Sequence, residues 1–254
     1  MKIRVLGAFG AEGLGARPAA FLIDDTILVD AGTVTGALPV ADQLRVEHAL
    51  ITHSHLDHCV GLAYLTETLA FCRPPTPLTI ASIEPVVTAL QTSIFNNVAW
   101  PDFALIPHAD TPIMKYRHLI EGVEQRVGDL WVTPVSVNHA VPTTGFIVHD
   151  GNAGVVFSGD TGPTDELWKV SRELRGIKAI VIECAFPNRM PELAEIAGHL
   201  TPELIRKELP KLPKDAPVWI YHVKPQFYDE IASELRRVDP DRIRIVEQDK
   251  TYTV

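Results

Sequence analysis

The chain has 254 residues, of which 46% are hydrophobic and 22% are charged, and its formal net charge is −9. This length suits one large domain with a buried core, so we expect a single domain over residues 1–254. Proteins that bind long nucleic acids usually carry a basic face, and the acidic balance therefore argues against nucleic acid as a partner. No apolar stretch is long enough to cross a bilayer, and we expect no membrane partner.

The N-terminal segment and the cysteines indicate the cellular compartment of the protein. The first ten residues, MKIRVLGAFG, alternate like a strand and include neither an apolar signal core nor a small-residue cleavage site, which predicts a cytoplasmic location. Cys59, Cys72 and Cys184 form no CxxC pair, and we expect no disulfide framework. The sequence is compatible with a monomer and with a homo-oligomer.

The first half of the chain is predicted to alternate short strands and helices. Apolar runs bounded by turn signals predict strands at residues 2–6, 20–23, 26–29, 48–52 and 78–81. Periodicity and a proline near a helix start predict helices at 56–69 and 84–94. Residues 95–126 have weak periodicity and several aromatic side chains, which predicts an insertion or lid.

The second half repeats this organisation. Strands are predicted at 130–137, 145–149, 154–157, 179–182 and, as the last two, 218–221 and 243–246. Helices are predicted at 164–174, 202–209 and 226–237, and proline clusters predict loops at 73–77 and 209–217. Two β-rich halves with helices after the strands predict an α/β fold in which two sheets pack together and the helices lie outside.

The strongest chemical signal is THSHLDH at 52–58, which follows a predicted strand and precedes a predicted helix. In an extended segment His53 and His55 project to the same side, and Asp57 and His58 can reach a second point where the chain turns. Three imidazoles and a carboxylate supply the nitrogen and oxygen ligands that suit zinc, iron or manganese. A helix start with chance histidines is the alternative, but the complete pattern after a strand favours a metal site.

Further candidate ligands follow later strands. His139 follows the strand at 130–137, Asp160 follows the strand at 154–157, and His222 follows the strand at 218–221. Because the two oxygens of a carboxylate can each take one cation, Asp160 is predicted to be shared between two ions. The predicted sets are His53, His55 and His139 for one ion, and Asp57, His58 and His222 for the other.

These motifs resemble the metallo-β-lactamase superfamily, and the similarity extends across nearly the whole chain. Within it, the sequence is most similar to the class II 3′,5′-cyclic-nucleotide phosphodiesterases. The segments that carry this similarity are LVDAGT at 28–33, THSHLDHCVGL at 52–62, SIFNNVAWP at 93–101, SGD at 158–160, IECAF at 182–186 and GHLTP at 198–202. The resemblance implies a four-layer αβ/βα sandwich of two mixed β-sheets flanked by helices. It also implies two divalent ions at the sheet edge, with zinc expected and manganese or iron as alternatives.

The resemblance implies hydrolysis of cyclic AMP or cyclic GMP to the nucleoside 5′-phosphate by a hydroxide that bridges the two ions. Glu183 and His199 resemble the pair that tRNase Z enzymes place beside their metals, and they join Asp57 as candidate catalytic residues. An imidazole near neutral pH can protonate the 3′-alkoxide leaving group, and Asp57 can orient the attacking water. Asp30 has two interpretations of equal weight: a carboxylate that hydrogen-bonds a ligand histidine, or an ordinary turn at a strand end.

Other activities compete with this hypothesis. A tRNase Z-like RNA 3′-processing endonuclease would need a basic RNA-binding arm, and the sequence offers none. A thioester or lactone hydrolase on the same scaffold would not need the Glu183/His199 pair. A non-catalytic metal-binding module is the weakest alternative, because all candidate ligands and the pair are present.

Two further patterns have a structural and a functional interpretation. Phe95, Trp100 and Phe103 can stack a purine ring, but aromatic residues in such a segment more often belong to the core. The glycines at positions 7, 10, 13 and 15 do not form GxGxxG, and they favour a turn that lines the metal edge over a phosphate cradle.

Overall fold

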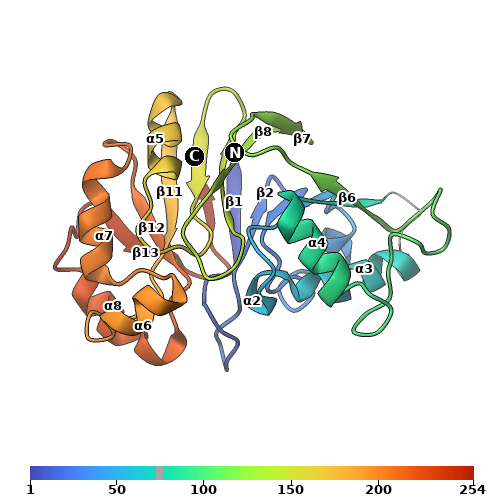
Figure 1. Ribbon diagram of the computed structural model, residues 1–254, viewed down its shortest axis with the longest axis horizontal. Helices are drawn as coiled ribbons and strands as arrows, with labels where there is room; N and C mark the ends of the chain where they lie inside the picture. The colour runs from blue at the N-terminus through green and yellow to red at the C-terminus, as the bar shows by residue number, and fades with distance from the viewer. Residues whose placement is uncertain (73–76) are drawn as a thin grey trace.

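The computed structural model describes residues 1–72 and 77–254 (Figure 1). The strands of the first sheet are β1 Lys2–Gly7, β2 Ala20–Ile23, β3 Ile27–Val29, β4 His48–Leu50, β5 Leu78–Ser82, β6 Met114–His118 and β14 Thr251–Thr253. The strands of the second sheet are β7 Gln125–Val127, β8 Leu130–Ser136, β9 Thr144–His149, β10 Gly154–Phe157, β11 Ile177–Glu183, β12 Val218–Tyr221 and β13 Ile243–Ile245.

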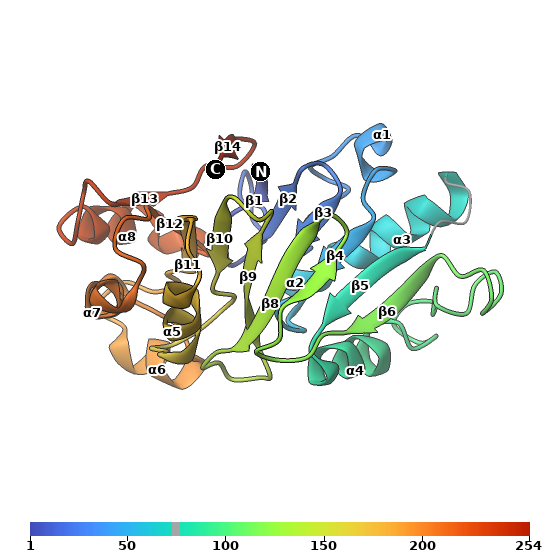
Figure 2. The ribbon, with the colours of Figure 1, turned by 90° about the horizontal axis from the view of Figure 1, so that it is seen from above.

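The helices belong to two groups, one for each sheet. The first group is α1 Val40–Gln43, α2 Leu56–Cys59, α3 Gly61–Cys72 and α4 Glu84–Ser93. The second group is α5 Glu166–Glu173, α6 Pro191–Ala197, α7 Pro202–Glu208 and α8 Tyr228–Leu235, with short 3-10 helices at Leu209–Lys211 and Pro225–Phe227. Figure 2 shows the first group on one side of the paired sheets and the second group on the other. Among the described helices, none has the length and apolarity that a membrane span requires.

Three buried apolar layers hold these elements together. One lies between the sheets and includes Phe21, Phe146 and Phe157. A second joins the first sheet to α3 and α4, and a third joins the second sheet to α5, α7 and α8. Three apolar layers separate four layers of secondary structure, because each sheet has both faces covered. The predicted four-layer αβ/βα sandwich is therefore confirmed.

Strand direction explains how one edge of the molecule collects polar residues. The first sheet has the order β14-β1-β2-β3-β4-β5-β6, and its pairs from β3 to β6 are parallel. The second has the order β13-β12-β11-β10-β9-β8-β7, with parallel pairs from β10 to β13. Strand β8 runs in the direction of β10, because each is antiparallel to β9. The carboxyl ends of β8, β10, β11 and β12 therefore meet at one edge.

Some predicted elements need correction. The helix predicted at 56–69 is two helices, α2 and α3, because Gly61 packs against the chain after β3. Its N–H donates to the Ala31 carbonyl at 2.8 Å, and a Cβ atom at Gly61 would fall 2.5 Å from that oxygen. The strand at 243–246 is not the last, since β14 pairs with β1 at the sheet edge. The helices α1 and α6 were also not predicted.

Residues 95–126 contain the strand β6 and the start of β7, two short edge strands of largely polar sequence. Phe95 and Phe103 are buried in the layer between the first sheet and its helices. Trp100 packs against that layer and donates its Nε1–H to the Ala63 carbonyl at 3.1 Å. These aromatic side chains belong to the core, and a lid function for this segment stays a prediction.

The remaining predictions concern loops and thiols. The loop predicted at 73–77 lies almost wholly outside the described residues, and the one at 209–217 begins with the 3-10 helix Leu209–Lys211. Cys59, Cys72 and Cys184 are free thiols, the first and last of them buried.

Candidate active site

The seven candidate metal ligands lie together at the edge where the two sheets end. His53 and His55 belong to the loop between β4 and α2, and Asp57 and His58 to the first turn of α2. The other three follow β8, β10 and β12 and are His139, Asp160 and His222. This edge carries α2 and α6 and is the lower one in Figure 1.

The first group of donor atoms comes from His53, His55, His139 and Asp160. The His53 Nε2 and His55 Nδ1 atoms are 3.0 Å apart, and the His139 Nε2 and His55 Nδ1 atoms are 3.3 Å apart. The His53 Nε2 atom lies 3.7 Å from Asp160 Oδ2. Two ligands of one tetrahedral zinc ion lie about 3.3 Å apart at ordinary bond lengths. This group therefore has the spacing of donors that share one ion.

The second group comes from Asp57, His58 and His222. The His222 Nε2 atom is 3.2 Å from Asp57 Oδ2 and also 3.2 Å from Asp160 Oδ2. The other oxygen of Asp160, Oδ1, is 3.3 Å from His58 Nε2. Asp160 thus faces both groups, which is the position expected of a bridging carboxylate.

Two buried polar atoms without hydrogen bonds indicate that metal ions fit this site. The His58 Nε2 and Asp160 Oδ1 atoms are buried and, although they lie 3.3 Å apart, neither makes a hydrogen bond of normal geometry to the other or to any other described residue. Burying polar atoms without partners costs free energy, whereas a cation would coordinate both atoms. The fold implies divalent metal ions, and these nitrogen and oxygen donors fit them. Zinc, manganese and iron all accept such donors.

Hydrogen bonds from the outer side fix three of the imidazoles. The Nδ1–H group of His58 donates to Asp30 Oδ2 at 2.7 Å, and that of His139 donates to the Gly198 carbonyl at 2.9 Å. His53 Nδ1 lies 3.0 Å from Thr52 Oγ1, whose hydroxyl donates to Asp30 at 2.9 Å. These bonds select the tautomer that leaves each Nε2 atom free to bind a metal.

Asp30 therefore accepts a hydrogen bond from a candidate ligand histidine, His58, as the first of its two interpretations requires. It also adopts a positive φ of 55° at the end of β3, so the turn interpretation describes the same residue. Thr52 and Gly198 were not singled out from the sequence. Their only signal was position, since each directly precedes a candidate histidine.

Glu183 and His199 form a buried pair beside the metal groups. His199 donates its Nδ1–H to Glu183 Oε1 at 2.7 Å, and the same oxygen accepts the Thr161 N–H at 3.1 Å. The His199 ring stacks on His222 at 5.3 Å between centroids and lies 5.0 Å from His139. Burial lowers the pKa of His199, but the charge of Glu183 and its hydrogen bond outweigh burial and raise this pKa above its usual value.

Burial and charge act in opposite directions on the candidate ligands: burial lowers the pKa of His58, but Asp160 and Asp30 outweigh it and hold this pKa well above its usual value. Burial holds the pKa of His53 well below its ordinary value, and it lowers the pKa of His139, which favours the neutral imidazole that binds metals. Burial raises the pKa of Asp160, but His222 and His58 outweigh it and hold this pKa well below the usual range. Asp160 is therefore ionised and can coordinate cations.

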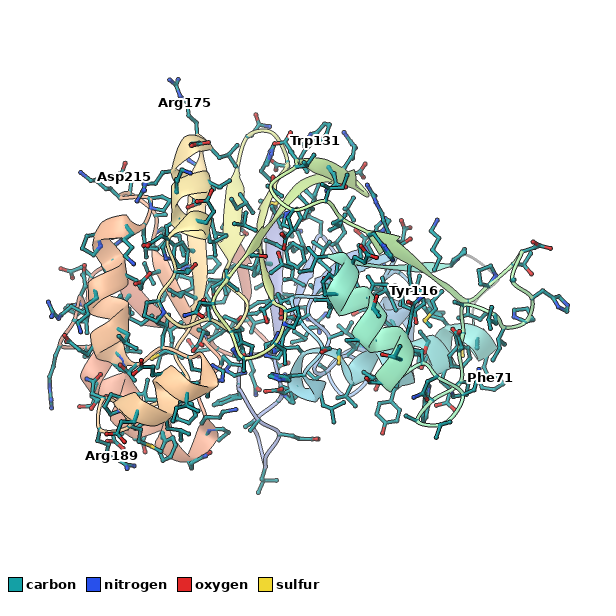
Figure 3. All side chains as sticks on the ribbon, in the orientation of Figure 1. Phe71, Tyr116, Trp131, Arg175, Arg189 and Asp215 are labelled. Atoms are coloured by element: carbon teal, nitrogen blue, oxygen red, sulfur yellow. The ribbon has the colours of Figure 1, made fainter. Side chains whose placement is uncertain are left out.

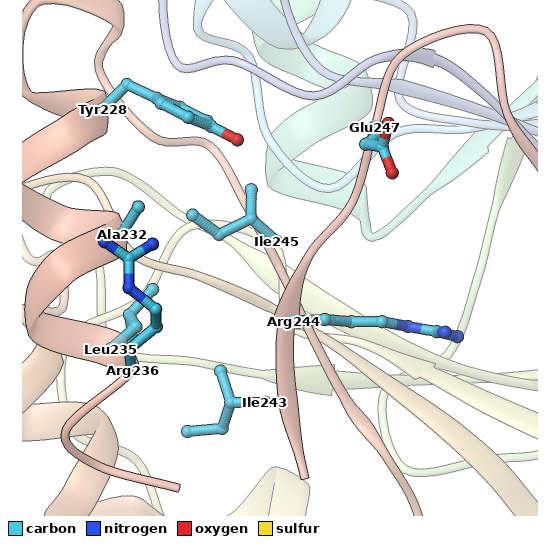
Figure 4. Close-up of a pocket in the computed structure, with 8 residues that line it drawn as sticks. All are labelled: Tyr228, Ala232, Leu235, Arg236, Ile243, Arg244, Ile245 and Glu247. Carbon is cyan, nitrogen blue, oxygen red and sulfur yellow. The ribbon is translucent and has the colours of Figure 1, made fainter. Parts of the chain in front are cut away.

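Two hollows elsewhere on the molecule are lined by none of the candidate metal ligands. Figure 4 shows a hollow of about 250 Å³ between α8 and β13, in which Arg244 points away from Tyr228 and Arg236. The Arg244 guanidinium lies 4.8 Å from the centroid of the Trp219 ring, so it is held by aromatic contact rather than aimed into the hollow. Phe71, which lies at the opposite end of the molecule from Arg189 and Asp215 (Figure 3), lines an apolar hollow of about 450 Å³.

A four-layer αβ/βα sandwich with histidine and aspartate donors at its sheet edge defines a metal-dependent hydrolase. Residues 25–220 match the family described as Beta-lactamase superfamily domain, and the chain belongs to this family, the metallo-β-lactamase superfamily. It is 28% identical over 279 residues to a 3′,5′-cyclic-nucleotide phosphodiesterase of Aliivibrio fischeri, a match that covers 86% of this chain and 82% of that one.

Solved structures share the fold. The crystal structure of unliganded yeast PDE1 has a TM-score of 0.83 at 21% identity and covers 98% of both chains. The short form of human tRNase Z has a TM-score of 0.72 at 18% identity and covers 100% of this chain and 99% of that chain. At these identities the likeness shows the fold alone.

Proposed function

We propose that this protein is a metal-dependent phosphodiesterase that hydrolyses 3′,5′-cyclic nucleotides to nucleoside 5′-phosphates. The observation that carries the proposal is the Glu183–His199 pair, whose imidazole Nδ1 lies 2.7 Å from Glu183 and 3.9 Å from Asp160 Oδ2. A proton donor beside a two-metal donor set suits a reaction whose leaving group is a poor one. The similarity to a relative named as a cyclic-nucleotide phosphodiesterase supports the same choice.

Two divalent ions, when bound, would lower the pKa of a water molecule and offset the negative charge of the phosphoryl group. The side chains of the protein position the other reactants. Asp57 has a side chain that is 27% exposed, whereas that of Asp160 is 2% exposed. Asp57 is therefore the carboxylate of the site that reaches incoming water, and we assign it the role of orienting the nucleophile.

His199 supplies the proton to the leaving group. When water attacks phosphorus, the bond from phosphorus to the ribose 3′-oxygen breaks, and the 3′-oxygen needs a proton because an alkoxide leaves poorly. Glu183 holds the Nδ1–H of His199, so the Nε2–H is the proton that transfers. The phosphate stays on the 5′-oxygen, and the product is the nucleoside 5′-phosphate.

A tRNase Z-like RNA 3′-processing endonuclease is the second candidate, since the same pair would serve it and a Ribonuclease Z of Kineococcus radiotolerans is 23% identical over 198 residues. The net charge of −9 makes an RNA substrate less favourable than a cyclic nucleotide. RNA brings many phosphates into an acidic field, whereas a cyclic nucleotide brings one negative charge that two cations can balance.

The proposal is tested by incubating the metal-loaded protein with cyclic AMP and cyclic GMP and separating the products by chromatography. We expect nucleoside 5′-phosphates. Formation of 3′-phosphates, or the absence of hydrolysis with both nucleotides, would contradict the proposal.

A further inference from the structure

A cavity of about 390 Å³ lies beside the candidate metal groups, on the side of the second group of helices. Its lining residues are Asn138, Gly162, Pro163, Pro191, Glu195 and Leu204. Asn138 directly precedes His139, and Gly162 follows Asp160 by two positions. The Gly162 N–H donates to the Asn138 carbonyl at 2.7 Å, so the inner wall of the cavity joins two segments that carry candidate ligands.

The cavity also borders the segment that carries the proposed acid. A Cβ atom at Gly162 would lie 3.8 Å from the carbonyl carbon of Gly198, the residue before His199. The acid must reach the ribose 3′-oxygen, and the base is attached to the same ribose. A nucleoside whose 3′-oxygen meets His199 would therefore have its base within reach of this cavity.

The lining combines apolar side chains with two acceptors. Pro163, Pro191 and Leu204 supply apolar surface of the kind that contacts the face of a base. Glu195 is exposed, and in the part of the chain that the structure describes nothing donates a hydrogen bond to its carboxylate, which leaves both oxygens open to an incoming group. The Asn138 side chain uses its Nδ2 atom on the Pro163 carbonyl at 3.5 Å, which leaves its Oδ1 atom as an acceptor.

These acceptors distinguish the two purines. Guanine presents two neighbouring donors, N1–H and the exocyclic amino group, and a carboxylate accepts such a pair with both oxygens. Adenine presents a donor beside the N1 acceptor, which would face the carboxylate unfavourably. None of the six lining residues carries a positive charge that would offset this repulsion.

The apolar hollow beside Phe71 does not offer this chemistry. It is lined by Ala70, Phe71, Pro101, Phe103, Ile106, Pro107 and Ile113, none of which has a polar side chain. It also lies by the C-terminal end of α3, whereas the candidate ligands lie before the start of that helix.

We propose that the cavity of Asn138, Gly162 and Glu195 receives the nucleobase of the substrate and that Glu195 selects guanine over adenine, an inference that rests on the proposed phosphodiesterase function. Glu195 lies near the end of α6, and its carboxylate accepts from N1–H and the amino group of guanine. An amide in its place pairs with adenine, because the side chain of glutamine offers one donor and one acceptor.

The test compares three metal-loaded proteins: the parent, Glu195→Gln and Glu192→Gln. Glu192 is an exposed residue of the same helix that does not line the cavity, so its variant controls for the loss of one negative charge. Calorimetry measures the binding of 5′-GMP and 5′-AMP, and kcat/KM is measured for cyclic GMP, cyclic AMP and bis(4-nitrophenyl) phosphate, which has no base.

We expect the parent and Glu192→Gln to prefer 5′-GMP, and Glu195→Gln to lose about tenfold in 5′-GMP affinity, the loss expected for one bidentate base contact. The cyclic GMP to cyclic AMP ratio of kcat/KM should fall in parallel, with bis(4-nitrophenyl) phosphate unaffected. Equal 5′-GMP affinities of the two variants, or a parent without guanine preference, would overturn the inference. A Glu195-dependent preference for 5′-GMP without cyclic nucleotide hydrolysis would support the cavity and reject the proposed function instead.

Discussion

Gly10 lies directly against the imidazole ring of His222, since a Cβ atom at Gly10 would fall 2.6 Å from Cε1 and 2.7 Å from Nδ1 of that ring. The Nδ1 atom of His222 is buried without a hydrogen-bond partner among the described residues, unlike the Nδ1 atoms of His58 and His139. The backbone reinforces this contact, because the His222 N–H donates to the Ala8 carbonyl at 2.6 Å. The turn after β1 therefore positions His222 by contact.

Replacement of Gly10 by alanine should displace the His222 ring and weaken the second metal group. Elemental analysis after dialysis should find about two ions per parent chain and about one per Gly10→Ala chain. Gly13→Ala is the matched control, because the nearest atom to its added Cβ would be Ala16 Cβ at 3.8 Å. Two retained ions in Gly10→Ala would contradict the role of this contact.

Asp160→Asn should lower the occupancy of both metal positions. Asp160 faces His53 and His222 with Oδ2 and His58 with Oδ1, and an amide lacks the charge and the second oxygen that a bridge requires. The measurement is the metal content of the folded variant, with circular dichroism as the check on folding. Full occupancy at both positions would refute the bridging assignment.

That the seven candidate ligands lie together could be predicted from sequence, because they follow apolar strands. His139 follows β8 and Asp160 follows β10, and strands that run in one direction end at one edge. The contact between Gly10 and His222 could not be predicted, because it depends on how the two sheets pack. The division of the predicted helix before Gly61 could not be predicted either. It depends on a contact with the Ala31 carbonyl, which overrides a continuous helical pattern.

The edge strands show a second limit. The strand β14 has the sequence TYT and is largely exposed, so no apolar alternation marks it. Its pairing with β1, from Lys2↔Thr253 to Arg4↔Thr251, exists only because the chain returns to the N-terminal strand. The cavity at Glu195 was missed for the same reason, since Asn138 and Glu195 come from separate segments that only the fold brings together.

His199→Ala should retain its metals and lose turnover in a way that depends on the leaving group. With a cyclic nucleotide the loss in kcat should be about 10²- to 10⁴-fold, the usual effect of removing a general acid. A nitrophenyl phosphodiester needs little protonation of its leaving group and should lose much less. Equal losses on the two substrates would instead indicate charge stabilisation by His199.

The pH dependence of kcat should report the Glu183–His199 contact. Glu183 raises the pKa of His199, and an acid catalyst is active only below its pKa, so activity should fall as pH rises through that value. Glu183→Gln removes the charge and lowers this pKa, which should move the alkaline fall in kcat to lower pH. Glu208→Gln is the control, since Glu208 is buried but bonds Trp168 Nε1 rather than a histidine of the site. An unmoved alkaline limb in Glu183→Gln would contradict proton donation by His199.

The most direct test of the phosphodiesterase account is a comparison of cyclic GMP, cyclic AMP and a precursor tRNA as substrates of one metal-loaded preparation over a range of salt concentrations. The account predicts hydrolysis of the cyclic nucleotides with a KM that depends weakly on salt, because each carries one negative charge. Efficient cleavage of the precursor tRNA with a steep salt dependence, together with intact cyclic AMP and cyclic GMP, would contradict it and favour the RNA-processing function.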